Sequence, residues 1–536
     1  MSEFPLGYER VPPTTWAYLS SLLMLALYFK FTRFWSIRNL DLLLILLLAP
    51  GLLMVHQGAS NRQKIFDEMN VAQEQGRWNP DQFRELDQQT EEGSEANGVS
   101  GTGDENEVRA ELDTRPLAVG ESSASELETP LDPTEVLDTQ KSLLVKWEAR
   151  FQQARKLEYS GYLFLFLVGG ILLVRMLLDS LMVRRPLLEP NLSSGGLTFM
   201  GTAMLVFLFA NIWMSNPVVT DLYQIGERGE DQAWWEVDQQ SDSLMVGPGY
   251  RPLYGTPILP TFVDTNREGS GGEQEVSVEQ ERLTKVFVIL SLLAIALGIV
   301  TIGSLHFDNF WMGIGIATFF LMLPYTVQMM GRVSHVFPAA LLVWALVTYR
   351  LPFFSGTLLG LATGVAFHPI FLLPLWISFY WKRGVYRFMT GFLLSIAILI
   401  FLLAYTSEGS SEFWGHLQKM FGLMLPRYHG LQGIWAAGWE PVFRLPLIAG
   451  SVALSGALVL WPARKNLGVL LSCSCAVMLA TQFWHSNGGG LVMAWYLPLA
   501  LLAIFRPNLE DRIALNAVRE SKLLRRPRPN VSAEMS

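Results

Sequence analysis

The sequence has little charge and almost no cysteine. Of its 536 residues only 16% are Asp, Glu, Lys or Arg, and its two cysteines, Cys473 and Cys475, lie one residue apart in an apolar segment. Cysteines at that spacing rarely pair, so we expect two small buried side chains and neither a disulfide framework nor a zinc site. Walker loops, dinucleotide-binding fingerprints and nucleophile elbows are also missing from the sequence, and we expect no cofactor and no nucleic-acid partner.

Apolar side chains, in contrast, make up half of the chain. The hydrophobic fraction is 50% and the mean hydropathy is +0.28, which is too apolar for a soluble protein of this size. A bilayer core of roughly 30 Å is crossed by about 20 apolar helical residues. The runs that reach or approach this length are 16–31, 40–55, 159–183, 197–214, 286–305, 310–329, 336–349, 356–367, 370–381, 389–405, 441–461, 467–483 and 491–505. They predict an all-α fold, a polytopic transmembrane helical bundle.

Two of these runs, 356–367 and 370–381, are too short to cross a bilayer and are separated by His368-Pro369. Proline removes a helix hydrogen bond and pushes the preceding residue out of the helical region, so we expect the helix to break here. We interpret the pair as a hairpin of half-length helices, which a membrane tolerates only inside the protein or beside a wet cavity. The chain then has about 11 full spans plus one half-helix hairpin.

The charges are segregated along the chain. Acidic residues outnumber basic ones by 22 to 11 in residues 57–158 and by 13 to 4 in residues 216–283, although the net charge of the whole chain is only −8. Cytoplasmic loops of membrane proteins collect Lys and Arg. If residues 356–381 form a hairpin and not a full span, all the basic clusters lie on one side of the membrane. They are Lys30/Arg33/Arg38, Arg184/Arg185, Arg350, Lys382/Arg383/Arg387, Arg464/Lys465 and the tail Lys522–Arg528. This predicts a bacterial inner-membrane protein with its N-terminus outside and its C-terminus in the cytoplasm.

The sequence predicts three regions. Residues 1–196 form an N-terminal transmembrane extension with the acidic extracytoplasmic loop 57–158, residues 197–506 form the core with the extracytoplasmic loop 216–283, and residues 507–536 form a basic cytoplasmic tail. The loop 57–158 has few aromatics before Trp147, so we expect it to bury little core and to be flexible or locally helical. It is also a candidate binding segment for a protein partner.

Three motifs follow one another in the predicted core. The first is Asp221-Leu-Tyr223, followed by Gly249-Tyr-Arg-Pro-Leu-Tyr254, and the second is Met330-Gly-Arg-Val-Ser-His335. The third runs from Gly356-Thr-Leu-Leu-Gly-Leu-Ala362 through Phe367-His-Pro-Ile-Phe-Leu-Leu-Pro374 to Trp381-Lys-Arg-Gly-Val-Tyr-Arg387. In this order the motifs resemble the polyprenyl-phosphate-sugar-dependent glycosyltransferases of the GT-C superfamily, most closely glycosyltransferase family 87. The resemblance covers roughly residues 197–505 and is best over 330–387.

The sequence departs from the family pattern where the phosphate would bind. Arg332 stands where the family prefers glutamine, His335 where it prefers asparagine, and Arg251 at the first proline of a turn. The family lysine falls near residues 366–367, where His368 is the nearest replacement. These differences bear on the binding of the lipid phosphate more than on the fold.

The resemblance implies transfer of a hexose, mannose by analogy, from a polyprenyl-phosphate donor to a glycan or lipid acceptor outside the cytoplasm. Such a reaction needs a base for the attacking hydroxyl, and cations or hydrogen-bond donors for the phosphate charge that develops. By resemblance Asp221 is the catalytic base, and Glu227, Asp231, Glu236 and Asp238 stay open as alternatives. Substrate binding is assigned to Tyr223, Tyr250, Arg251, Arg332, His335, His368, Arg427 and His429. The apolar runs contain no clustered acidic residues that could bind a metal ion. The acidic loop 216–283 could supply such ligands, so the metal dependence stays open.

Simpler explanations and other functions also stay open. Asp221 is also explained as a solvated carboxylate, Arg332 as a helix cap or lipid-headgroup contact, and His368 as a buried histidine bonded to a carbonyl that Pro369 frees. A catalytically silent GT-C-like scaffold would account for the missing lysine. A transporter or flippase would suit the broken helix, but that class is expected to carry paired broken helices in two halves, and only one break is evident.

Overall fold

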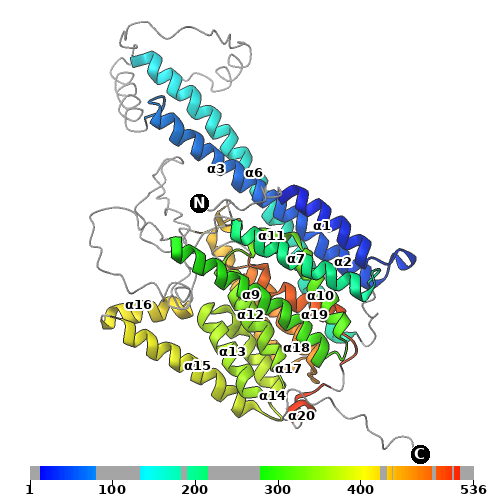
Figure 1. Ribbon diagram of the computed structural model, residues 1–536. Coiled ribbons are helices and arrows are strands. Elements are labelled where there is room, and N and C mark those ends of the chain that lie inside the picture. Colours follow the sequence, from blue (N-terminus) through cyan, green and yellow to red (C-terminus); the bar gives the residue numbers. More distant parts are fainter. Residues whose placement is uncertain are drawn as a thin grey trace, which may run out of the picture. The chain divides into compact units, whose positions relative to one another are not determined.

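The chain forms helices and no strand within the residues that its structure, a computed structural model, describes: 13–79, 133–182, 190–214, 278–407, 409–422, 431, 433–436, 439–485, 491–509 and 512–518 (Figure 1). The α-helices are α1 (Pro13–Tyr28), α2 (Ile37–Leu46), α3 (Leu48–Glu74), α6 (Pro133–Leu178), α7 (Ser194–Met214), α9 (Val278–Leu305), α10 (Phe310–Met322), α11 (Pro324–Met329), α12 (Val333–Val347), α13 (Pro352–Val365), α14 (Leu373–Tyr380), α15 (Val385–Thr406), α16 (Ser410–Phe421), α17 (Arg444–Leu460), α18 (Leu467–Gln482), α19 (Leu497–Phe505) and α20 (Ala514–Ala517). Short 3-10 helices are η1 (Phe31–Arg33), η2 (Asp179–Leu181), η4 (His368–Leu372), η5 (Gly433–Ala436), η6 (Pro441–Phe443) and η7 (Met493–Trp495). The predicted all-α class is confirmed.

Six helices of the described residues are long and apolar enough to cross a membrane. They run over Ile37–Glu74, Gln140–Leu181, Ser194–Met214, Arg282–Leu305, Val385–Tyr405 and Pro441–Leu460, and seven apolar helices of 10–17 residues accompany them. Along α6, Leu167, Ile171 and Val174 recur at helical spacing with 63%, 51% and 55% of their surface exposed. Such a continuous exposed apolar stripe fits an integral membrane protein, because lipid and not water would cover it.

Residues 56–158 group as a unit of their own, and their described parts are helical, which agrees with the expectation of a flexible or locally helical segment. Its described parts are the second half of α3 and the first half of α6, which pair antiparallel. Trp78 packs edge-on against Trp147 with 5.7 Å between ring centroids, and Arg150 donates twice to Glu68, at 2.5 and 2.9 Å. Two paired helices need only one narrow apolar seam, which these contacts supply.

The remaining residues, 1–55 and 159–536, form the second unit, the helical bundle. The predicted hairpin lies within it: α13 and α14 are joined through η4, which begins at His368. Tyr380, the last residue of α14, donates its hydroxyl hydrogen to the carbonyl of Tyr349, just before α13, at 2.5 Å. The hairpin therefore starts and ends at the same place. Its first leg has 14 residues and is roughly 21 Å long, short of a bilayer core.

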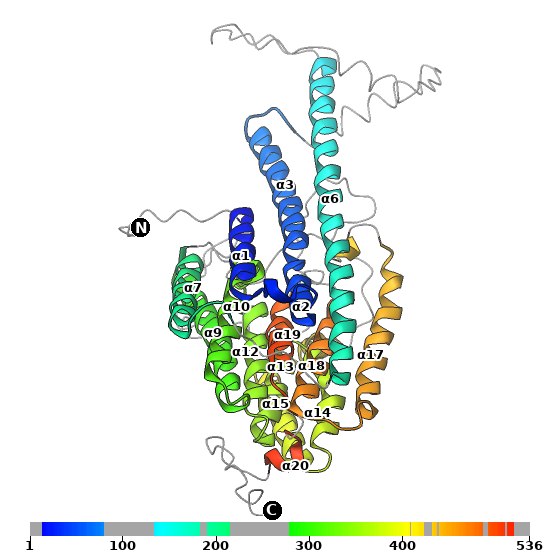
Figure 2. The same cartoon turned by 90° about the vertical axis from the view of Figure 1, so that its right-hand side faces the viewer.

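One end of the bundle gathers basic residues from distant parts of the chain, and we call it the basic end. The contacts that define it are Arg512 with Asp308 at 2.7 Å, Arg383 with the carbonyl of Leu515 at 3.5 Å, Arg350 with the carbonyl of Leu305 at 3.5 Å, and the backbone bridge between Asn466 and Ile513. Figure 2 shows α14 and α20 together at this end. Of the predicted basic clusters, Arg184/Arg185 and the tail 522–528 lie outside the described residues.

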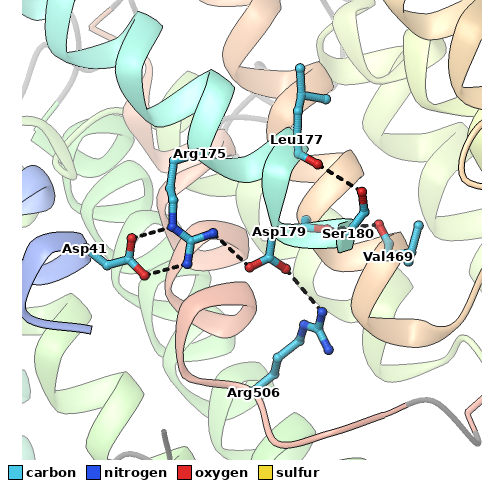
Figure 3. A network of polar contacts seen from close by, with 8 residues as sticks. Asp41, Arg175, Leu177, Asp179, Ser180, Val469 and Arg506 are labelled. Carbon is cyan, nitrogen blue, oxygen red and sulfur yellow. Dashed lines mark hydrogen bonds and ion pairs between the residues drawn. The ribbon is translucent and has the colours of Figure 1, made fainter. Parts of the chain in front are cut away.

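Four charged side chains from four separate parts of the chain's secondary structure, α2, α6, η2 and the residue after α19, pair near the basic end (Figure 3). Arg175 of α6 donates twice to Asp41 of α2, at 2.6 Å each, and once to Asp179 of η2, at 3.0 Å. Arg506, which follows α19, donates to Asp179 at 3.2 Å. The side chain of Asp179 is fully buried, and the other three are no more than 14% exposed. This ionic network, formed by Asp41, Arg175, Asp179 and Arg506, joins an N-terminal helix to the end of the core.

Candidate functional site

The other end of the bundle brings together segments that are far apart in the sequence. α18 starts at the basic end and has 16 residues, so its last turn lies roughly 24 Å away. After it, the ring of His485 stacks on His368 at the tip of the hairpin, with 4.7 Å between centroids. Trp495, at the end of η7, packs against both histidines at 5.2 and 5.7 Å.

The turn between α11 and α12 adjoins the same place. The indole nitrogen of Trp495 donates to the carbonyl of Ser334 at 3.1 Å, which fixes the start of α12 beside η7. The start of α12 carries Arg332 and His335, the two ionisable residues of the second motif. We call the resulting group the histidine site, and its members are Arg332, His335, His368, Trp484, His485 and Trp495.

His368 is enclosed by aromatic rings. Its ring lies 4.1 Å from Phe367, 5.1 Å from Trp484 and 5.2 Å from Trp495 between centroids, and only 2% of the residue is exposed. The nitrogen Nδ1 is buried without a hydrogen-bond partner among the described residues. Nδ1 therefore does not bond a carbonyl freed by Pro369 among the described residues. Buried polar atoms without partners are uncommon and call for a ligand, a water or a functional role.

His335 is held by a chain of hydrogen bonds. Its Nδ1 lies 2.9 Å from the hydroxyl oxygen of Tyr325 in α11, and the backbone N–H of Ala494 donates to the same oxygen at 2.9 Å. His335 is 4% exposed and Tyr325 is 2% exposed. The imidazole is therefore fixed by two segments, α11 and η7, which lie 169 residues apart.

Arg332 brings a positive charge to the site. It occupies the N-cap position of α12, but its side chain makes no capping hydrogen bond, so the helix-cap explanation is not supported. A cation at a helix N-terminus is unfavourable because the helix dipole is positive there, and an anion nearby would offset that cost. Arg332 is close enough to interact electrostatically with both His335 and Tyr325.

A second guanidinium group approaches from α17. Arg444 is 5% exposed, and its Nε and Nη2 donate to the backbone carbonyl of Trp484 at 3.3 and 3.2 Å. This contact orders the segment that carries Trp484 and His485. None of these three residues was predicted from the sequence, although a tryptophan and a histidine at the end of an apolar run are a recognisable signal for an interfacial polar site.

The structure brings together three of the nine predicted site residues, Arg332, His335 and His368. The other six, which are Asp221, Tyr223, Tyr250, Arg251, Arg427 and His429, lie outside the described residues. Cys473 and Cys475 are buried and free, as expected. Among the residues that the structure describes, no group of three or more His, Cys, Asp or Glu side chains is placed to hold a metal ion.

The histidine site combines features that suit an anionic group with an apolar attachment. An arginine offers a planar fork of donors that matches phosphate oxygens, and imidazoles offer N–H donors without a permanent charge. The surrounding tryptophan and phenylalanine rings exclude water, which strengthens each polar contact. No protein-family model, curated protein or solved structure matches the chain.

Proposed function

We propose that this protein is an integral membrane glycosyltransferase of the GT-C type, which moves a hexose from a polyprenyl-phosphate donor to a glycan or lipid acceptor outside the cytoplasm. The observation that supports the proposal is the convergence of Arg332, His335 and His368. The family resemblance assigns these residues to the phosphate from two motifs, and in the bundle they meet at one end, where His485 joins them.

The proposed step is a displacement at the anomeric carbon of the donor sugar. The acceptor hydroxyl oxygen forms a bond to that carbon while the bond from carbon to the phosphate oxygen breaks, and the polyprenyl phosphate leaves with the bonding electrons. The proton of the hydroxyl goes to the base, for which Asp221 is the candidate. Arg332 and the imidazoles of the histidine site stabilise the negative charge that grows on the leaving phosphate.

The distribution of charge supports an orientation for this reaction. Basic residues collect on the cytoplasmic side of membrane proteins, so we place the basic end in the cytoplasm. The histidine site then faces the outer side of a bacterial inner membrane, with the N-terminus outside, about 11 full spans and the hairpin entering from the cytoplasm. A lipid-linked sugar would present its phosphate at the same depth.

The orientation can be tested by labelling introduced cysteines. Lys382 at the basic end and Ser410 at the start of α16 are both exposed, whereas native Cys473 and Cys475 are fully buried and should not react. In intact spheroplasts, a membrane-impermeant maleimide should label the Ser410→Cys variant and leave the Lys382→Cys variant unlabelled until the membrane is opened. The reverse pattern would show that the histidine site faces the cytoplasm.

The activity can be tested with purified protein in liposomes that contain a polyprenyl-phosphate hexose and an acceptor extract. We expect Arg332→Leu and His368→Leu to lower the rate of sugar transfer by about a hundredfold, the usual effect of removing one donor to a developing charge. Asp221→Asn should abolish transfer without reducing expression.

Arg383→Gln is the matched control, since Arg383 is exposed at the basic end and should not affect the reaction. Transfer that stays at the wild-type rate in Arg332→Leu and His368→Leu would remove the histidine site from the mechanism. No transfer by the wild-type protein from any polyprenyl-phosphate hexose would count against the proposed function itself.

A further inference from the structure

The hydrogen bonds around Tyr325 determine which nitrogen of His335 carries the proton. A tyrosine hydroxyl has one hydrogen to donate and can accept from two donors. Its oxygen already accepts from the backbone N–H of Ala494 at 2.9 Å, and the only described acceptor for its own hydrogen is Nδ1 of His335, also at 2.9 Å. Both the hydroxyl hydrogen and Nδ1 are satisfied when Nδ1 is the unprotonated nitrogen and accepts from Tyr325. In the neutral ring the proton then lies on Nε2.

The geometry keeps this arrangement from relaxing. Tyr325 and His335 are 2% and 4% exposed, and their rings are nearly parallel at 7°, so surrounding side chains hold both rings in place. Which ring nitrogen of a histidine carries the proton is set by the hydrogen bond that the second ring nitrogen makes. No hydrogen bond among the described residues uses Nε2 of His335.

We propose that Tyr325 is a positioning residue that holds His335 in the Nε2–H form, and that this N–H donates to an oxygen of the lipid phosphate. The second part rests on the proposed function, because the phosphate is that of the polyprenyl carrier. Arg332 supplies the positive charge, and His335 supplies a directed donor that adds no second charge. The sequence cannot show this role, because Tyr325 belongs to none of the three motifs and meets His335 only through the turn between α11 and α12.

The tautomer is measured by nitrogen NMR of the full-length protein labelled with ¹⁵N in its seven histidines. The signals of His335 are identified by their loss in His335→Gln. We expect wild-type His335 in the Nε2–H form and the Tyr325→Phe variant as a mixture of both tautomers. His306 is an internal standard, because its Nε2 lies 2.8 Å from the carbonyl of Val347, which can only accept.

The matched control is Tyr28→Phe. Tyr28 is also buried, at 1% exposure, and its hydroxyl donates to the carbonyl of Gly315 at 2.8 Å, away from the histidines. The Tyr28→Phe variant loses a comparable hydrogen bond and should leave the His335 signals unchanged. A wild-type His335 with its proton on Nδ1, or a Tyr325→Phe spectrum identical to wild type, would overturn the positioning role.

The phosphate contact is measured by binding of geranyl phosphate, a short isoprenyl phosphate, with geraniol and inorganic phosphate as comparison ligands. We expect His335→Leu to weaken geranyl phosphate binding about tenfold or more, the effect of losing a hydrogen bond to a charged group. His335→Gln places an amide N–H near the position of Nε2 and should restore most of the affinity. Geraniol should bind all variants equally.

The outcomes separate this inference from the proposed function. Equal geranyl phosphate binding by wild type and His335→Leu would overturn the phosphate contact. Equal loss of geraniol binding would show that the substitution acts through the apolar surroundings, which also contradicts the proposal. Neither measurement uses sugar transfer, so a protein with the expected tautomer and binding but no transfer would contradict the transferase alone.

Discussion

The Arg175→Leu variant is expected to lose about 3–5 kcal/mol of unfolding free energy, the usual effect of removing one partner from a buried ion pair. Arg175 makes two hydrogen bonds to Asp41 and one to Asp179 within the ionic network. Its removal leaves two carboxylates facing one guanidinium, that of Arg506, in a region where solvent cannot screen the excess negative charge. The free energy is measured by unfolding of the purified protein in mixed micelles.

Arg150→Leu is the matched control, because it removes an arginine with the same two-pronged geometry from an exposed pair. Arg150 and Glu68 have side chains that are 50% and 47% exposed, so this change should cost less than about 1 kcal/mol. The double variant Asp41→Leu/Arg175→Leu restores electrical balance and should be more stable than Arg175→Leu alone. A loss in Arg175→Leu no greater than in Arg150→Leu would show that the network is not a stabilising element.

The Gly391→Ala and Gly356→Ala variants are expected to be destabilised by about 3 kcal/mol or more, at the upper end of the range for overpacking. α13 and α15 approach so closely that a Cβ atom at Gly391 would lie 2.1 Å from the carbonyl oxygen of Phe353, and one at Gly356 would lie 2.0 Å from that of Phe388. Both obstacles are backbone atoms within helices, so they cannot rotate away as a side chain would. The helices would have to separate.

The same substitution has the opposite expected effect where no helix faces the glycine. Gly450 lies in α17, and a Cβ atom added there would meet no neighbouring helix within 4 Å. Gly450→Ala should therefore be neutral or more stable by about 1 kcal/mol through its higher helix propensity. Thermal unfolding followed by size-exclusion chromatography can compare all three variants. Equal stability of Gly391→Ala and Gly450→Ala would contradict the close packing of α13 and α15.

The glycine contacts also connect stability with the candidate site. α13 ends three residues before His368, so a displacement of α13 away from α15 would move the hairpin tip. Gly356→Ala should therefore reduce sugar transfer in the fraction of protein that still folds, whereas Gly450→Ala should not. A hairpin held along its length by backbone contact is a rigid support for a buried side chain.

Much of the fold could be predicted because it depends on local properties of the chain. Most apolar runs became single helices, and the proline after His368 produced the break that joins α13 to α14 through η4. The run 310–329 was predicted as one span, but Pro324 divides it into α10 and α11. Residues 57–158 are locally helical where α3 and α6 continue into them, as expected, but the contact between Trp78 and Trp147 could not be predicted from composition. Composition averages over a window, but a helix pair is stabilised by a few residues at the correct spacing.

The ionic network could have been suspected from the sequence but not assembled from it. Arg175 and Asp179 lie four residues apart within the apolar run 159–183, and charged residues within such a run are expensive unless they are paired. Their spacing predicts a contact along one helix face, which the structure has. Asp41 and Arg506 are the other partners, and nothing local indicates that chain segments so distant would meet them.

The sequence by itself determined the helical class, the apolar segments and the position of the break, because hydrophobic length, proline and charge act within a few residues of where they occur. Only the tertiary structure decided that Arg332, His335 and His368 share an end with His485, and that Tyr325 holds His335. Those relations depend on how helices pack across hundreds of residues. Packing is set by the fit of whole surfaces, and no single motif contains that information.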